Sequence, residues 1–169
     1  MDEWRAIDGF PNYEIHRDGY VLNTKTGRIL KASKNRDGYL RVDLCHNGVK
    51  ESKRIHQLVG IAFIQNPLGK SSVDHINGDK TNNSLENLRW ATMREQLQNK
   101  PSKGYSKKKG AKKNPWQVLI HNSEGKNIHI GVFPTEELAQ QAVREARIKH
   151  HGEFANLTPF DEEVQHPAD

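Results

Sequence analysis

Residues 73–80 read Val-Asp-His-Ile-Asn-Gly-Asp-Lys and residues 87–90 read Asn-Leu-Arg-Trp, and these two segments decide how the chain folds around a reactive centre. The first segment places the carboxylate of Asp74 beside the imidazole of His75 and continues into a polar loop. A carboxylate binds hard metal ions through oxygen, and a neutral imidazole can take a proton from water near neutral pH. Together they are the minimum equipment for metal-assisted cleavage of a phosphodiester bond.

Asp74-His75, Asn87 and the Leu-Arg-Trp-Ala-Thr that follows resemble the HNH motif of phage homing endonucleases. The resemblance implies a ββα unit that holds one divalent metal ion, with His75 as the general base and Asp74 as a metal ligand. It also implies that Asn87 holds the loop that orients His75. The second metal ligand of the family sits on the following helix, where this chain has Gln96 in place of Asn, and Asn99 is the alternative ligand.

Two readings of the segment remain open. An Asp-His pair among Gly, Asn and Asp residues is also compatible with an ordinary turn, because these residues form turns for backbone reasons alone. The whole pattern, with its apolar lead-in and its Asn-Leu-Arg-Trp close, is more specific and favours the nuclease interpretation. Because carboxylate and amide oxygens are hard ligands, the expected cofactor is one divalent ion, Mg²⁺ or Mn²⁺.

Composition limits the classes of protein to consider. The chain has 169 residues, of which 34% are hydrophobic, and this favours several small modules over one large core. The formal net charge of +5 indicates a polyanionic partner. The single cysteine, Cys45, excludes an internal disulfide and a cysteine-based zinc site. No apolar run is long enough for a membrane span and no signal-peptide pattern is visible, so we expect a cytoplasmic protein, in the host cell if it is phage-encoded.

The first 54 residues predict short strands joined by tight turns. The tetrapeptide Arg-Asp-Gly-Tyr occurs twice, at 17–20 and 36–39, and each copy marks a turn that leads into a strand. Residues 3–15 resemble the NUMOD-type module found upstream of HNH motifs, and whether this aromatic-anchored hairpin contacts DNA or only packs is open. The strands predicted from β-rich runs cover residues 13–15, 20–22, 28–30 and 39–44.

Residues 55–64 are apolar at helical spacing and predict a helix that supports the nuclease unit, ended by Pro67. Leu58, Ile61 and Ala62 are expected on its buried side. His56 at its start is interpreted as a structural residue, although relatives make a ligand role conceivable.

A second helix is predicted after the second strand of the nuclease unit. Thr92 and Glu95 form a capping box, which places the start of this helix near Thr92. The residues around the site would thus form two short strands followed by a capped helix.

The carboxy-terminal part begins with a basic segment. Residues 100–113 contain seven lysines and no acidic residue, which is typical of a solvated linker or of a nucleic-acid contact. Residues 103–108, 116–121 and 126–133 predict three strands, and Thr135 to about His150 a helix ended by Gly152, with Leu138, Ala142 and Ala146 as its apolar stripe. Gly-Tyr-Ser, Trp116, the Ile-Gly-Val-Phe run and the closing 151–156 resemble the Apetala-type DNA-binding domain.

Alternation assigns the faces of this sheet. Trp116, Val118, Ile120, Ile128 and Ile130 should face the helix, whereas the outward face, which lies in the major groove in the resembled family, should carry amide and imidazole side chains. An ordinary solvated face is the alternative. The residues predicted to contact DNA are Lys103, Tyr105, Lys107, Lys108, Gln117, Leu119, His121, Asn127 and His129.

The fold class predicted is α+β, with a β-hairpin module, a ββα-metal nuclease unit and a three-stranded sheet packed on one helix. The function predicted is a metal-dependent HNH endonuclease of the phage homing type that cuts double-stranded DNA as a monomer. The alternatives are a DNA-binding regulator with a degenerate HNH unit and an RNA-binding protein. The modules are 1–54 (NUMOD-like), 55–99 (HNH), 100–113 (basic linker and first strand), 114–157 (remainder of the Apetala-like domain) and 158–169 (tail).

Overall fold

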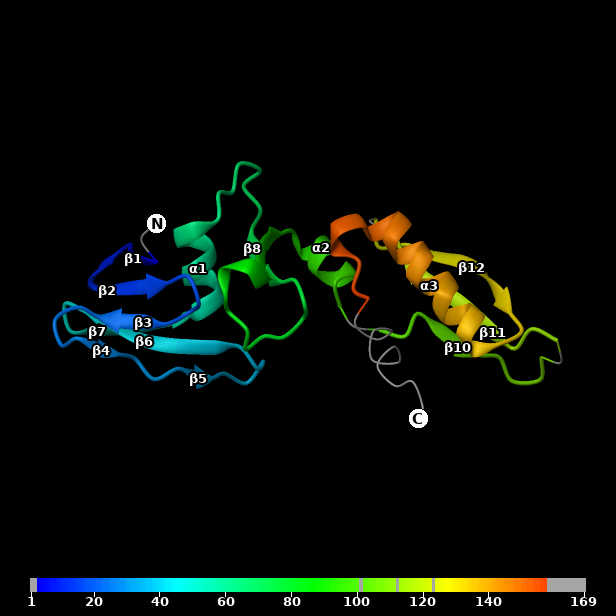
Figure 1. The fold of residues 1–169 in the computed structure, drawn as a ribbon, viewed down its shortest axis with the longest axis horizontal. Helices are drawn as coiled ribbons and strands as arrows, with labels where there is room; N and C mark the ends of the chain where they lie inside the picture. The colour runs from blue at the N-terminus through cyan, green and yellow to red at the C-terminus, as the bar shows by residue number, and fades with distance from the viewer. Residues whose placement is uncertain (1–2, 101, 112, 123, 158–169) are drawn as a thin grey trace, which may run out of the picture. The chain divides into compact units, whose positions relative to one another are not determined.

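The computed structural model describes residues 3–100, 102–111, 113–122 and 124–157; the predicted tail, 158–169, lies outside them. The chain divides into two compact units, Met1–Thr92 and Met93–Asp169 (Figure 1), which are described separately below. Small antiparallel sheets and short helices build both units, so the predicted α+β class is confirmed.

The amino-terminal unit begins with two small antiparallel sheets. The first has the order β1-β2-β3-β4 and the second the order β5-β6-β7. Strands lie at the four predicted places, and β1 pairs with β2 as the hairpin predicted over residues 3–15 requires, whereas β5 and β7 were not predicted. Strand β7 is polar and mostly exposed, so it lacks the alternating pattern that would reveal a strand, and its pairing with β6 defines it. The strands are β1 (Trp4–Ile7), β2 (Phe10–His16), β3 (Val21–Asn23), β4 (Arg28–Ile29), β5 (Ser33–Lys34), β6 (Leu40–His46) and β7 (Val49–Arg54).

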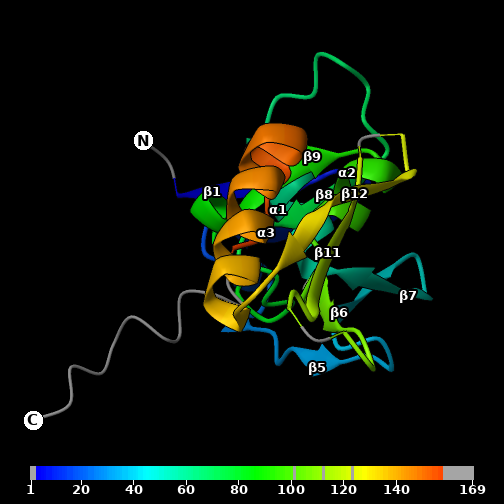
Figure 2. The ribbon, with the colours of Figure 1, turned by 90° about the vertical axis from the view of Figure 1, so that its right-hand side faces the viewer.

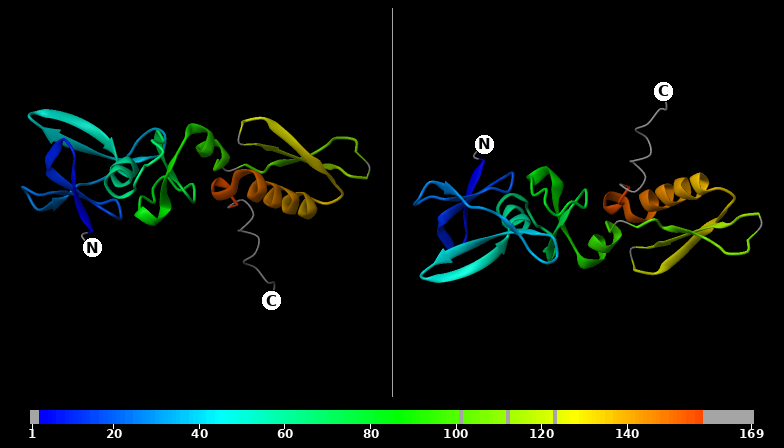
Figure 3. Two further views of the ribbon diagram at one scale, coloured as in Figure 1. Left: turned by 90° about the horizontal axis from the view of Figure 1, so that it is seen from above. Right: turned by 90° about the horizontal axis from the view of Figure 1, so that it is seen from below.

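Helix α1 (Ile55–Phe63) is the centre of this unit and packs against the sheets on one side and the β8–β9 pair on the other (Figure 3). Leu58 is buried as predicted, but Ile61 is 66% exposed, because the buried face is formed by Ile55, Val59 and their neighbours. The helix also ends before the predicted Ile64, which is extended.

Gly60 decides how closely α1 approaches β8. A Cβ atom at this position would lie 2.4 Å from Cγ2 of Val73, so only glycine fits without a shift of the strand. Strands β8 (Ser72–His75) and β9 (Leu88–Ala91) pair antiparallel, joined by a loop that ends in the short helix η1 (Leu85–Asn87). The helix α1 therefore carries on its surface the strand that bears Asp74 and His75.

The carboxy-terminal unit starts with α2 (Met93–Gln98), which begins directly after Thr92 as the capping box predicts. A three-stranded antiparallel sheet follows, with the order β10-β11-β12, and α3 lies against one of its faces (Figure 2). The first strand is shorter than the predicted 103–108. The elements are β10 (Tyr105–Lys107), β11 (Trp116–His121), β12 (Asn127–Phe133), α3 (Glu136–His151) and η2 (Gly152–Phe154).

The ends of α3 agree with the sequence, whereas its buried stripe differs. Thr135 accepts a hydrogen bond from the backbone N–H of Leu138, and Gly152 ends the helix with a positive φ. Leu138 itself is 45% exposed, whereas Ala146 is buried as predicted and Ala142 is half-buried. The buried stripe consists of Ala139, Val143 and Ala146. These residues follow the spacing i, i+4, i+7 of one helical face, while Leu138 is rotated by about 100° from Ala139.

In the described part of the chain, no helix is both long and apolar enough to span a membrane.

Candidate functional site

The β8–β9 pair fixes the position of Asp74. Asp74 lies opposite Arg89 in the antiparallel register, and an Arg89 guanidinium nitrogen donates to the Asp74 carboxylate at 3.1 Å. Each side chain is only 13% exposed. Arg89 therefore holds the carboxylate in a fixed, partly buried position, and the carboxylate oxygens are of the hard type that binds divalent metal ions.

His75 follows at the end of β8 and is almost fully buried. Its ring lies 4.9 Å from the ring of His56 and 5.9 Å from the ring of Tyr39, between centroids. The Nε2 atom lies 3.1 Å from the side-chain oxygen of Asn83, which is buried as well. Burial lowers the pKa of His75, against the smaller raising effects of Asn83 and Asp74, so the imidazole is held in the neutral form that a general base requires.

Asn87 holds both ends of the polar loop that follows His75. Its side-chain oxygen accepts from the backbone N–H of Asn77 at 3.1 Å, and its Nδ2 donates to the carbonyl oxygen of Asn82 at 2.8 Å. Within the loop, the hydroxyl and backbone N–H of Thr81 donate to Asp79 and lower the pKa of that carboxyl. These contacts are those of a loop-holding residue, and a role of Asn87 in catalysis stays a prediction.

His56 is buried beside the site. Its burial is the main cause that lowers the pKa of His56 to about 3, and unfavourable electrostatic interactions with His75 and Arg54 add to it. Its Nδ1 atom has no hydrogen-bond partner. Among the described residues, no group of three or more His, Cys, Asp or Glu side chains is placed to hold a metal ion.

The two candidate second ligands lie on or near α2, in the carboxy-terminal unit. Gln96 is half-buried on the helix. Asn99 is 4% exposed, and its backbone carbonyl accepts from Asn156 at 2.7 Å. Arg147 in turn donates to the carbonyl of Asn156 at 2.8 Å, which fixes Asn99 inside the core of this unit.

The outward face of the β10–β12 sheet carries most of the predicted DNA-contacting side chains. Leu119, His121, Asn127 and His129 are exposed, and Gln117 is half-buried on the same side. The inward residues pack on α3 as predicted. A register shift beside Leu119 places it opposite His129.

Tyr105 does not belong to that face. It pairs with Val118 in the register, so it points toward α3, and its hydroxyl donates to Glu136 at 2.9 Å. The predicted contact of Tyr105 with DNA would therefore have to come from the side of the sheet that faces α3, and it stays a prediction. Lys107 pairs with Trp116 and lies on the same side as Tyr105, with its Nζ atom 5.5 Å from the Trp116 ring, while Lys103 and Lys108 are exposed.

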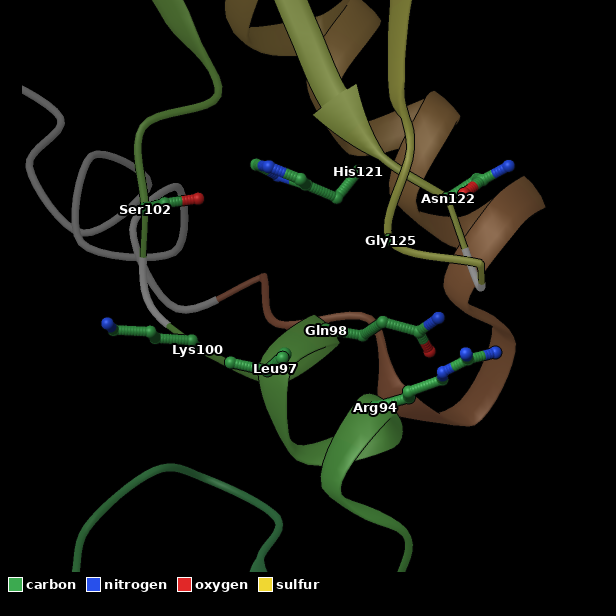
Figure 4. Close-up of a pocket in the computed structure, with 8 residues that line it drawn as sticks. All are labelled: Arg94, Leu97, Gln98, Lys100, Ser102, His121, Asn122 and Gly125. Carbon is green, nitrogen blue, oxygen red and sulfur yellow. The ribbon is translucent and has the colours of Figure 1, made fainter.

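A pocket of about 390 Å³ lies in the carboxy-terminal unit, between α2 and the turn that joins β11 to β12 (Figure 4). The side chains that line it do not converge on one point: His121 and Asn122 extend in opposite directions, and so do Lys100 and Arg94. Its lining residues are Arg94, Leu97, Gln98, Lys100, Ser102, His121, Asn122 and Gly125.

Sequence reasoning missed two neighbours of His75. Asn83 was not predicted to contact the imidazole, although it is one of several Asn residues in the loop. Tyr39 was identified only as the end of the second Arg-Asp-Gly-Tyr copy. The repeat was thus the available signal, and only the fold reveals what it contacts.

Comparison with protein-family models finds two matches. Residues 2–45 match the NUMOD4 motif and residues 65–98 match the HNH endonuclease model. The predicted resemblance to both modules is confirmed, and neither of these two matches extends into the predicted Apetala-type domain.

Sequence relatives come from viruses and phages. The chain is 36% identical over 103 residues to the DNA endonuclease I-HmuI of Bacillus phage SP01, covering 60% of this chain and 59% of that protein. It is 43% identical over 100 residues to the uncharacterized HNH endonuclease L247 of Acanthamoeba polyphaga mimivirus, covering 56% of this chain and 25% of the relative. A third relative is the H-N-H endonuclease F-TflII of Escherichia phage T5, 31% identical over 90 residues, 52% of this chain and 47% of that protein. The chain spans a third or less of the length of the two mimivirus relatives it matches.

Among solved structures, the chain resembles that of the HNH homing endonuclease I-HmuI, from a structure of DNA binding and cleavage by that enzyme. The TM-score is 0.55 at 25% identity, and the match covers 90% of this chain and 95% of that one. The fold is therefore similar to that of this homing endonuclease, and the segment that carries Asp74, His75 and Asn87 lies inside the match to the HNH endonuclease model.

Proposed function

We propose that this chain is a metal-dependent HNH endonuclease of the phage homing type that hydrolyses phosphodiester bonds in double-stranded DNA. The observation that carries the proposal is the buried, neutral His75 beside the partly buried Asp74 at the end of β8, inside the segment that matches the HNH endonuclease model.

In this function His75 removes a proton from the attacking water. Its burial supports the role, because a histidine with a lowered pKa stays unprotonated and can accept a proton at neutral pH. Asn87 holds the loop that begins after His75, and so restricts the motion of the imidazole.

HNH nucleases generally use a divalent metal ion, and the residues present fit one. Asp74 offers a hard oxygen ligand, and its pairing with Arg89 holds the carboxylate in a fixed position. Mg²⁺ is commonly held by one or two carboxylates, with water and substrate phosphate completing its shell, which agrees with the scarcity of acidic ligands. When bound, the ion supplies positive charge at the scissile phosphate and the leaving 3′ oxygen. The burial of Asn99 favours Gln96 as the further ligand that the sequence predicts.

For the carboxy-terminal unit we propose an Apetala-like role in DNA binding through the outward face of its sheet. The sheet-and-helix layout supports this role, and so do Gln117 and Asn127, whose amides are able to bond adenine edges. Leu119 and Val132 are 40% and 41% exposed, and their apolar surface suits a thymine methyl group. The lysines that flank β10 would hold phosphate.

The test is cleavage of supercoiled plasmid with Mg²⁺ or Mn²⁺ by the parent chain and by His75→Ala. We expect His75→Ala to bind DNA within a few-fold of the parent and to cut it about 10²-fold more slowly or worse. His46→Ala, which removes a half-exposed histidine of the β6–β7 hairpin, is the matched control and should cut like the parent. Equal cleavage by His75→Ala would contradict the role of His75.

The alternative function is a DNA-binding regulator with a degenerate HNH unit, which the departure at Gln96 favours. A parent chain that binds duplex DNA and cuts none with any divalent ion would support this alternative. Gln96→Asn, which restores the shorter amide of relatives, should keep or raise cleavage if the nuclease is active.

A further inference from the structure

The two copies of Arg-Asp-Gly-Tyr lie against the loop that follows His75. In the first copy, Gly19 has a φ of +86°, and a Cβ atom added there would lie 2.8 Å from Cβ of Asn83. The carbonyl oxygen of Arg17 accepts from the backbone N–H of Leu85 at 2.8 Å. The turn at 17–20 thus packs against Asn83, and only a glycine at position 19 leaves room for the Asn83 side chain.

The second copy contacts the other side of the same loop. Its Tyr39 ring lies 5.9 Å from the His75 ring. Lys80 of the loop donates to the backbone carbonyl of Asp37 at 2.9 Å, and its ammonium lies 4.7 Å from the centre of the Tyr39 ring. The amino-terminal module therefore contacts the loop that follows His75 at two places, once through each copy of the repeated turn.

The hydrogen bonds of Asn83 determine which way its amide points. Its Nδ2 atom lies 3.2 Å from the carbonyl oxygen of Thr81, which can only accept. The amide oxygen must then be the atom that faces His75, at 3.1 Å from Nε2. Because an amide oxygen can only accept as well, Nε2 of His75 must carry the proton in the neutral imidazole.

We propose that Asn83, seated against Gly19, is a positioning residue that holds His75 as the Nε2–H tautomer, so that Nδ1 is the nitrogen that takes the proton from water. The proposal rests on the proposed function, because it presupposes that His75 is the base. The proposal gives the amino-terminal module a part in catalysis, because the turn at 17–20 supports Asn83, which orients His75. A wrong tautomer would present an N–H to the water and could accept no proton.

The direct test is the tautomer of His75 in the metal-free full chain. Long-range ¹H–¹⁵N correlation spectra of histidine-labelled protein, recorded at a pH where histidine is neutral, distinguish the two forms. His75→Gln identifies the signal of His75. We expect a single Nε2–H tautomer, and an Nδ1–H form or an even mixture would overturn the proposal whatever the activity.

Asn83→Leu removes the acceptor and keeps the branching at Cγ. We expect the His75 signal to move toward a mixture of tautomers and kcat to fall by about 10-fold or more, with KM and DNA affinity within a few-fold of the parent. A His75 signal that stays purely Nε2–H in this variant would refute the role of Asn83, even if cleavage falls.

A second pair of variants tests the same contact if Asn83→Leu does not fold. Gly19→Ala adds a methyl group against Asn83, whereas Gly48→Ala, also at positive φ, meets no atom within 4 Å. Both carry a similar backbone strain, so a tautomer change in Gly19→Ala alone is expected. The same His75 spectrum in both variants would contradict the proposal.

The outcomes separate the inference from the function. If His75→Ala cuts like the parent, the proposed base is wrong, whatever the tautomer. If His75→Ala is inactive and His75 is an Nδ1–H tautomer, the nuclease function stands and the proposal for Asn83 fails.

Discussion

Replacing His56 by Leu should make the amino-terminal unit markedly less sensitive to acid. The pKa of His56 falls from 6.5 to about 3 on folding, first because of burial and then because of His75 and Arg54. Above pH 6.5 both states are neutral and the shift has no effect. Below it, the unfolded chain binds a proton that the folded one refuses, so the free energy of unfolding drops by about 1.4 kcal/mol per pH unit, reaching a loss of about 5 kcal/mol near pH 3.

The assay is urea unfolding followed by tryptophan fluorescence at several pH values. A Trp116→Phe background removes the one tryptophan of the carboxy-terminal unit, so that Trp4 and Trp90 report on the amino-terminal unit. Between pH 6.5 and 5 the background protein should lose about 2 kcal/mol through His56, in addition to any loss through His75, and His56→Leu should be spared that part. Because Nδ1 of His56 has no hydrogen-bond partner, replacing His56 by leucine leaves no group without its partner at that atom. His46→Leu is the control and should follow the background protein. If His56→Leu loses as much stability in acid as the control does, His56 is not buried in its neutral form.

Three further predictions concern packing, capping and DNA contact. Gly60→Ala places a methyl group 2.4 Å from Val73 and should destabilise the chain by about 1–3 kcal/mol in urea titrations, with Val73→Ala restoring part of the loss in the double variant; additive effects would contradict this contact. Thr135→Ala removes the cap of α3 and should cost about 1 kcal/mol, whereas Thr135→Ser should cost little; equal losses would show that the hydroxyl is not the cap. Replacing Lys107, Lys108 and Lys109 together by Gln should weaken binding to every duplex alike, and should flatten the slope of log K against log salt by about 1 for each phosphate that the variant no longer neutralises. Gln117→Ala should instead change the sequence preference by about 1–3 kcal/mol. Unchanged binding by the triple variant at every salt concentration would show that the basic segment is only a linker.

Local sequence signals were sufficient wherever a residue's neighbours along the chain decide its structure. Gly and Asp marked the tight turns, Thr135 and Gly152 marked the ends of α3, and alternation assigned the faces of β11. Strand β7 was missed because it carries no alternating pattern: after Val49 its side chains are polar on both faces.

Predictions failed where a tertiary neighbour decided the outcome. Leu138 and Ile61 have apolar side chains and lie on predicted helices, yet both are exposed because the sheet beneath each helix accepts a different stripe. No sequence pattern indicated the side on which Tyr105 lies: pairing with Val118 turns it toward α3, where its hydroxyl donates a hydrogen bond to Glu136. Periodicity reveals that a face is apolar without revealing the angle at which it packs.

The sequence by itself determined the chemistry of the candidate site: a carboxylate beside an imidazole, a polar loop, and an Asn at the far end of that loop, all within a short stretch of chain. The tertiary structure decided the state of those groups. Burial between Tyr39 and His56 keeps His75 neutral. Asn83 can contact His75 because Gly19, far away in sequence, has no side chain to occupy the space that Asn83 fills. Protonation and orientation depend on burial and on partners distant in sequence, which exist only once the chain has folded.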